Sequence, residues 1–312
     1  MFPKQSVRGF ESEPVQSYSD LIQDRGGLTF LSHLEERMDW QITGLTGLEI
    51  YNTHADFKDE KRLLASLRNP LWLLKAADLC RKYPQEAYSS LQHYPADYLK
   101  RWDELCLQQP HTGVSANDAH QNIGISIRMA EGQKLRVEDA AGDKLLELDA
   151  AAMRTVVPGV SDATVGSELF RMRLDPYENS LCHVATHLLM PELTQEAVWQ
   201  ALRNGRAFVA FDWMASARGF EFFAESAGVR FEMGDHPILV DTLRLTGRAP
   251  LPALWKLIRN GQTVSESSGT DWTAVVQESG NYRVELWLEV AGDPHLWILS
   301  NPIYVAAPQA DR

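Results

Sequence analysis

The order of hydrophobic and polar positions changes near residue 219. Before it, short apolar runs such as Leu28–Ser32 and Leu48–Tyr51 are bounded by glycine and polar residues, which is typical of strands buried on both faces. Helical patterns lie between such runs. Ser17–Arg25 gathers its apolar residues on one face, and Thr194 is a good N-cap for a helix over Gln195–Arg203. This alternation of strands and helices predicts a parallel α/β architecture.

Two longer segments predict further helices in this part of the chain. Glu60–Arg81 has a helical apolar pattern, and Tyr88–Cys106 has another that Pro95 interrupts. Three short β-type runs follow within residues 123–150, and they predict a small β insertion. Leu181–Leu189 is a further strand-like run, in which two histidines would face the same side, so we expect both to be structural.

From residue 219 onward the chain consists of short β-type runs separated by turn residues. The runs are Phe220–Ala224, Ile238–Thr246, Leu254–Arg259, Thr273–Gln277, Tyr282–Val290 and Trp297–Leu299. Asn260-Gly261 between two of them is a strong hairpin signal. We therefore expect an α/β domain over residues 1–218 and an all-β antiparallel sandwich over residues 219–312.

Composition narrows the range of partners. The chain has 312 residues, of which 44% are hydrophobic and 23% charged, and its net charge is −12. Nucleic-acid binding needs clustered Lys and Arg, so this balance and the lack of a basic run argue against it. Three scattered cysteines offer no disulfide framework, and no apolar run has the length of a membrane span. The first ten residues hold no apolar signal core, so we expect a cytoplasmic protein, with a signal peptide preceding Met1 left open.

Candidate chemistry gathers where the predicted strands end. His33, Glu49, His54, Asp118 and His120 lie at strand ends or in the loops that follow. Mixed imidazole and carboxylate groups are the ligands of hydrolytic metal ions, and in parallel α/β folds they meet at the carboxyl edge of the sheet. Glu49 is a strong candidate because a carboxylate inside an apolar strand is costly unless it is paired or metal-bound. In an extended segment Asp118 and His120 would point the same way.

Several other chemistries lack their signatures. The sequence has no GxSxG, P-loop or GxGxxG motif. Paired carboxylates acting without a metal stay open, although the histidines would then have no role.

An ordered series of motifs resembles the PHP (polymerase and histidinol phosphatase) family. It comprises GLTFLSHLEER with GLTGLEIYN, the tripeptide Asp118-Ala119-His120, and ALRNGRAFVAFD at Ala201–Asp212. The segments KLIRNG, GNYRVELWL and WILSNPIYV are similar to segments of bacterial members with an appended C-terminal β-domain. The resemblance covers nearly the whole chain.

The resemblance implies a distorted (β/α)7 TIM-like barrel that binds two or three divalent ions (Mn, Zn or Fe) and hydrolyses a small phosphorylated substrate. Carried over by motif, Glu11 resembles the bridging glutamate, and His33 resembles the histidine of the family's His-Pro pair, with Leu34 in place of proline. Asp118 and His120 resemble the closing D-x-H, which would be both ligand and catalytic. The remaining ligand is Glu49 or His54, and Arg37 is the candidate for contact with the substrate phosphate.

The chain departs from the family at its start. The family's H-x-H and T-D-H motifs do not occur, so the resemblance implies a partial barrel without its first strands and an impaired metal-dependent phosphoesterase. Whether the chain is an enzyme stays open. The alternatives are a non-catalytic binding or scaffold protein and, second, an amidohydrolase, which usually adds a lysine ligand.

Overall fold

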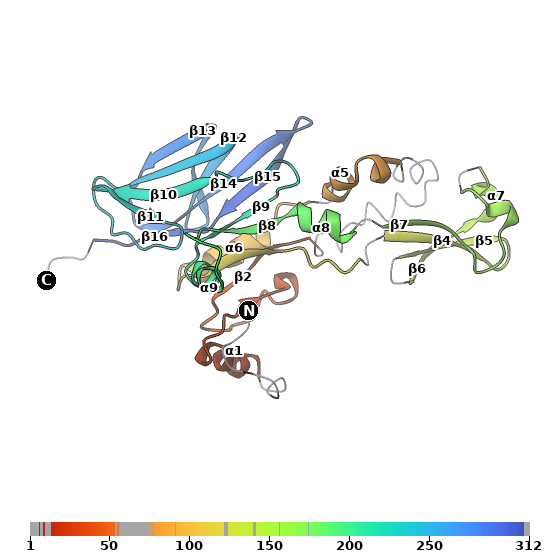
Figure 1. Ribbon diagram of the computed structural model, residues 1–312, viewed down its shortest axis with the longest axis horizontal. Coiled ribbons are helices and arrows are strands. Elements are labelled where there is room, and N and C mark those ends of the chain that lie inside the picture. Colours follow the sequence, from red (N-terminus) through yellow and green to blue (C-terminus); the bar gives the residue numbers. More distant parts are fainter. Residues whose placement is uncertain are drawn as a thin grey trace. The chain divides into compact units, whose positions relative to one another are not determined.

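The computed structural model describes residues 6, 9, 14–53, 55, 75, 78–90, 92–121, 124–139, 142–155, 157–173 and 175–308. Two units divide the chain, and each is assembled from separate stretches. The first unit holds Met1–Tyr51, Tyr94–Ala116 and Val184–Arg312, and the second holds Asn52–His93 and Asn117–His183. Most of the helices and strands of the two units are labelled in Figure 1.

The N-terminal part of the first unit is built on a three-stranded sheet in the order β1-β2-β3. Its strands are β1 (Phe30–Leu31), β2 (Gly47–Asn52) and β3 (Thr112–Ala116). β1 pairs with β2 in parallel, as the buried apolar runs predict. A Cβ at Gly47 would lie 2.0 Å from the carbonyl oxygen of Thr112, so only glycine lets the strands approach this closely.

Two helices of this unit follow from the amphipathic pattern. α1 (Val15–Asp24) matches the helix expected over Ser17–Arg25. α6 (Ala96–Cys106) starts directly after Pro95, which is its N-cap residue, as expected from the restriction that proline places on the chain. Trp102 is fully buried, and its indole nitrogen donates to the carbonyl of His111 at 2.9 Å. The apolar face of α6 is thereby fixed against the segment that leads into β3.

The larger sheet of the first unit is antiparallel and curled, and it contains nine strands among the described residues. Its order is β11-β10-β12-β14-β15-β9-β8, with β13 beside β12 and β16 beside β14. The strands are β8 (Ala185–Leu188), β9 (Ala207–Ala210), β10 (Glu221–Ser226), β11 (Val229–Glu232), β12 (Arg244–Arg259), β13 (Gln262–Val275), β14 (Gly280–Val290), β15 (Asp293–Ser300) and β16 (Ile303–Val305). α9 (Gln195–Arg203) connects β8 to β9, and Thr194 caps it by accepting from the backbone N–H of Ala197 at 3.2 Å.

This sheet continues across residue 219. β9 pairs with β15, and β8 pairs with β9, both antiparallel. The predicted antiparallel β structure of the C-terminal part is confirmed, and β8 and β9 extend it with strands that precede residue 219. The inner face holds a core in which Phe222, Trp255 and Trp297 are fully buried.

The Asn260-Gly261 hairpin is confirmed at the joint between β12 and β13. Asn260 has φ 52° and Gly261 has φ 79°, and positive φ at both central residues is what a type I′ turn requires. The turn therefore fixes the register Arg259 to Gln262.

The second unit contains a four-stranded antiparallel sheet in the order β6-β5-β4-β7. Its strands are β4 (Gly124–Ala130), β5 (Lys134–Asp139), β6 (Lys144–Asp149) and β7 (Glu168–Arg173), and α7 (Ala150–Met153) follows β6. The three strands expected within residues 123–150 are confirmed, with β7 as an additional member. One face of the sheet buries its own apolar cluster, which includes Leu135 and Val137.

The helical part of this unit corrects one prediction. Leu181–Leu189 is not a single strand: α8 (Tyr177–His183) ends at His183, and β8 begins two residues later. The packing of α8 against α5 (Pro84–Ser89) outweighed the strand-like composition. His183 packs against α5, where its Nδ1 lies 3.0 Å from the hydroxyl of Ser89. Burial lowers the pKa of His183 to about 3, so its imidazole is neutral and structural.

Most of the helix expected over Glu60–Arg81 lies outside the described residues. The described residues contain both helices and strands and include the parallel pair β1–β2, but they do not show the predicted TIM-like barrel. In the described part of the chain, no helix combines the length and apolar character that crossing a membrane would require.

Candidate metal site

The candidate site begins where β1 ends. His33 follows this strand in the left-handed conformation, with φ 50° and ψ 56°, and precedes a 3₁₀ turn, Leu34–Glu36. Its backbone N–H donates to Oε2 of Glu49 at 2.9 Å. A non-glycine residue in this conformation costs about 1–3 kcal/mol and persists only where its surroundings hold it there. Glu49, which β2 presents beside β1, is one group that holds it.

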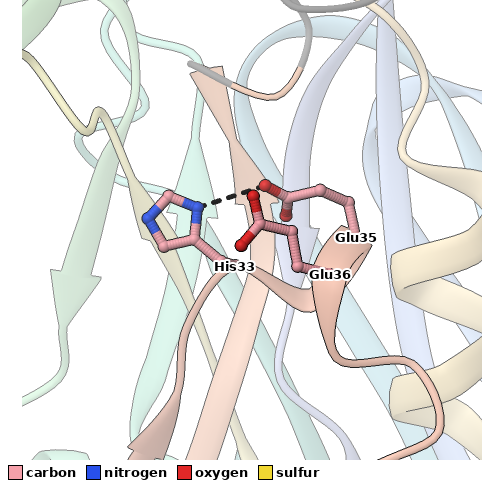
Figure 2. Close-up of side chains that lie close together, drawn as sticks. All are labelled: His33, Glu35 and Glu36. Carbon is pink, nitrogen blue, oxygen red and sulfur yellow. Dashed lines mark hydrogen bonds and ion pairs between the residues drawn. The ribbon is translucent and has the colours of Figure 1, made fainter.

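Three side chains converge at this turn. His33, Glu35 and Glu36 each offer one ligand atom, and these atoms all lie within 4.8 Å of one another. Nδ1 of His33 donates to Oε1 of Glu35 at 3.1 Å. Figure 2 shows both carboxylates directed toward the imidazole. The local chain folds this way because the left-handed residue turns the backbone sharply, so that residues two and three positions later return to the histidine.

Glu35 is the most constrained of the three. Its second oxygen accepts a hydrogen bond from the hydroxyl of Tyr98 on α6. Burial raises the pKa of the Glu35 carboxyl, but the hydrogen bonds from Tyr98 and His33 outweigh it and hold the pKa below its usual value. Burial and the neighbouring Glu35 carboxylate raise the pKa of Tyr98 well above that of a free phenol. The pair is therefore a tyrosine that donates to an ionised glutamate.

Arg37 braces the backbone of the turn. Its guanidinium donates to the carbonyl oxygens of Ser32 at 2.8 Å and His33 at 3.3 Å, and it lies over the ring of Trp40. These contacts fix the strand end from which His33 projects. Contact of Arg37 with a substrate phosphate stays a prediction.

Asp118 and His120 belong to the second unit, in the loop after β3. Asp118 has a left-handed φ of 47°, and its Oδ1 lies 2.8 Å from Nε2 of His120. The two side chains come together, as their spacing suggested, but through the left-handed backbone at Asp118 and not through an extended strand. Asp118 is mostly buried, whereas the side chain of His120 is 59% exposed.

Two predicted ligands, Glu11 and His54, lie outside the described residues. Of the predicted ligand set, the structure brings Glu49 to the backbone of His33 and pairs Asp118 with His120. Glu35, Glu36 and Tyr98 were not among the predicted site residues. A signal was present, since two carboxylates follow the candidate histidine within three positions, but Tyr98 comes from 63 residues further along the chain and carries no motif.

A second histidine–carboxylate pair was also missed. Nε2 of His187 on β8 lies 2.7 Å from Oδ2 of Asp212, and its ring stacks on Phe208 at 4.7 Å between centroids. Asp212 follows β9 and also accepts the backbone N–H of Ala217 at 3.1 Å. Burial raises the pKa of Asp212, but these hydrogen bonds lower it further than burial raises it. The pair joins two neighbouring strands, which agrees with the structural role expected of His187.

The chain was compared with family models, with curated proteins and with solved structures, and none of them matches it.

Proposed function

We propose that the turn holding His33, Glu35 and Glu36 binds a divalent metal ion, and that the protein is a metal-dependent phosphoesterase. The observation that carries the proposal is the convergence of one imidazole and two carboxylates within 4.8 Å. Ligands at about 2.0–2.2 Å from one ion stand roughly 3–4 Å apart from each other, so the 3.1 Å between His33 and Glu35 is already a suitable spacing. Nitrogen and carboxylate oxygen together suit Mn, Zn or Fe.

Residues around His33, Glu35 and Glu36 orient these three candidate ligands. Tyr98 keeps Glu35 ionised, which a carboxylate ligand must be. Glu49 holds the backbone of His33, and Arg37 holds the two carbonyls around it. Each of these contacts fixes the direction in which a ligand projects, as the outer residues of metal sites generally do.

A bound divalent ion would polarise a phosphate ester and lower the pKa of water. The resemblance to the PHP family supports the choice of a phosphate ester and of a partial (β/α)7 barrel. The parallel pairing of β1 and β2, with His33 directly after β1, is in keeping with sites at the carboxyl ends of barrel strands.

The test is metal content followed by activity. The full chain, dialysed against Mn²⁺ or Zn²⁺ and then desalted, should retain metal in stoichiometric amounts. His33→Ala and Glu36→Gln should each lower retention, and p-nitrophenyl phosphate hydrolysis, even if slow, should fall with it. His93→Ala, which removes an exposed histidine of the second unit, is the matched control.

Equal retention by the His33→Ala and wild-type chains would refute the site. Retention without hydrolysis of any phosphate ester would leave a metal-binding turn and favour the binding or scaffold protein.

A further inference from the structure

A cavity of the first unit lies at the start of β3. Its volume is about 390 Å³, within the range of small-molecule sites. The lining comes from the start of β3, the end of α9, the turn after β11, and β16, and includes His111, Arg203, Arg206, Gly234, His236 and Tyr304.

The walls of this cavity are fixed by close backbone packing. A Cβ at Gly234, whose φ is +86°, would lie 1.7 Å from the carbonyl oxygen of Asn204. No side chain other than glycine fits there, so the turn after β11 lies directly on the end of α9. His111 is fixed as well, since it is 3% exposed and its Nδ1 donates to the carbonyl of Leu45 at 2.9 Å.

The charge of the lining is positive in a chain whose net charge is −12. Asp235 is the one carboxylate among the lining residues, and both of its oxygens are engaged. Oδ1 accepts from Arg206 at 2.6 Å, and Oδ2 accepts the backbone N–H of Glu232 at 2.8 Å. Arg203 therefore adds a positive charge that no carboxylate of the lining balances.

A further donor comes from the other wall. His236 is exposed and its ring stacks on Tyr304, with centroids 4.9 Å apart and planes 13° from parallel. Tyr304 is itself fixed, because its hydroxyl accepts the backbone N–H of His111 at 3.2 Å. The stacking holds the imidazole of His236 in the cavity lining, and an imidazole N–H is a hydrogen-bond donor.

We infer that this cavity binds the phosphate group of a small molecule through Arg203 and His236. Donors from two separate segments suit a tetrahedral oxyanion, whereas a planar carboxylate is satisfied by one guanidinium fork. A phosphate monoester carries close to two negative charges at neutral pH, which increases its attraction to this lining. The volume leaves room for an organic group attached to the phosphate.

The inference is independent of the proposed metal site, and its test keeps the two apart. Titration calorimetry of the full chain in EDTA, which removes divalent ions, should show saturable binding of inorganic phosphate and of glycerol 3-phosphate. Acetate should bind more weakly. Arg203→Gln and His236→Gln should each weaken phosphate binding about tenfold or more, as expected for loss of a hydrogen bond to a charged group.

Two controls complete the design. Arg218→Gln removes an exposed arginine outside the cavity lining and should bind phosphate like the wild type. His33→Ala, which should lose metal, should also keep phosphate binding in EDTA. The inference is overturned if phosphate produces no binding signal, if Arg203→Gln and His236→Gln bind as the wild type does, or if acetate binds as tightly as phosphate.

Discussion

Arg283 binds Asp103 through two parallel hydrogen bonds, from Nε to Oδ1 at 2.9 Å and from a terminal nitrogen to Oδ2 at 2.8 Å. The remaining terminal nitrogen donates to Glu285 at 2.8 Å. Arg283 lies on β14 and Asp103 on α6, 180 residues apart in sequence. This fork joins the helix that supports the candidate metal site to the centre of the large antiparallel sheet.

Removing the aspartate charge should destabilise the fold strongly. Arg283 is 3% exposed, and a buried charge that loses its partner costs about 3–5 kcal/mol. Because Glu285 remains, we expect Asp103→Asn to lower the free energy of unfolding by an amount near the lower end of that range. Urea unfolding followed by tryptophan fluorescence measures it.

The matched control is an ion pair at the surface. Arg248 and Asp271 pair at 3.2 Å with side chains 66% and 69% exposed. Asp271→Asn should change the free energy of unfolding by at most ~1 kcal/mol. Losses of similar size in both variants would contradict the structural role given to the buried fork.

The His187–Asp212 pair should contribute to stability in a pH-dependent way. The pKa of Asp212 is lowered in the folded protein from its usual value of 3.8. A depressed folded-state pKa stabilises fully above the unfolded value, and this stabilisation is lost as pH falls through the folded value. The difference in unfolding free energy between wild type and Asp212→Asn should shrink as the pH falls below the unfolded-state value of 3.8. A difference that does not vary with pH would contradict this assignment.

Tyr98 should determine how far the pH can fall before metal binding weakens. Its hydrogen bond helps to hold the pKa of Glu35 down against the effect of burial. Tyr98→Phe removes that bond, so the pKa of Glu35 rises and the carboxylate is protonated at a higher pH. Mn²⁺ binding should then weaken at a higher pH than in wild type as the solution is acidified. Tyr83→Phe, at an exposed tyrosine, should leave the pH profile of Mn²⁺ binding unchanged.

The cap of α9 should contribute modestly to stability. Thr194→Ala removes the acceptor of the Ala197 N–H and should cost about 1 kcal/mol. Thr194→Ser keeps the hydroxyl oxygen and should restore most of that free energy. Thermal unfolding of the two variants in parallel would show the difference. Equal losses would mean that the methyl group of Thr194, and not the cap, is responsible.

Local patterns predicted much of the secondary structure because the physical cause is local. The cap at Thr194, the helix start after Pro95, the hairpin at Asn260-Gly261 and the buried strand at Gly47–Asn52 all depend on neighbouring residues. The strand predicted over Leu181–Leu189 from local composition was wrong. Its first residues belong to α8, which packs against α5, and the two contacting residues Ser89 and His183 are 94 positions apart.

The candidate site was predictable only in part. His33 and Glu49 were found because histidine at a strand end and glutamate within an apolar strand both need an explanation. The left-handed backbone at His33, which brings Glu35 and Glu36 back to it, has no simple signature in the residue types. The contact with Tyr98 requires the position of α6, which depends on pairings as distant as Arg283 with Asp103.

Strand β12 of the large sheet pairs with different strands along its two halves. β12 pairs with β10 over Arg244–Arg248 and with β14 over Leu254–Arg259, while β13 accompanies it on both sides of an irregularity between Arg248 and Ala253. Pro250 and Pro252 occupy that irregularity, where proline removes no ladder hydrogen bond. Local unfolding at either end of β12 disturbs the same β12–β13 hairpin. Amide hydrogen exchange should therefore show that the part of β12 paired with β10 and the part paired with β14 unfold as one cooperative unit.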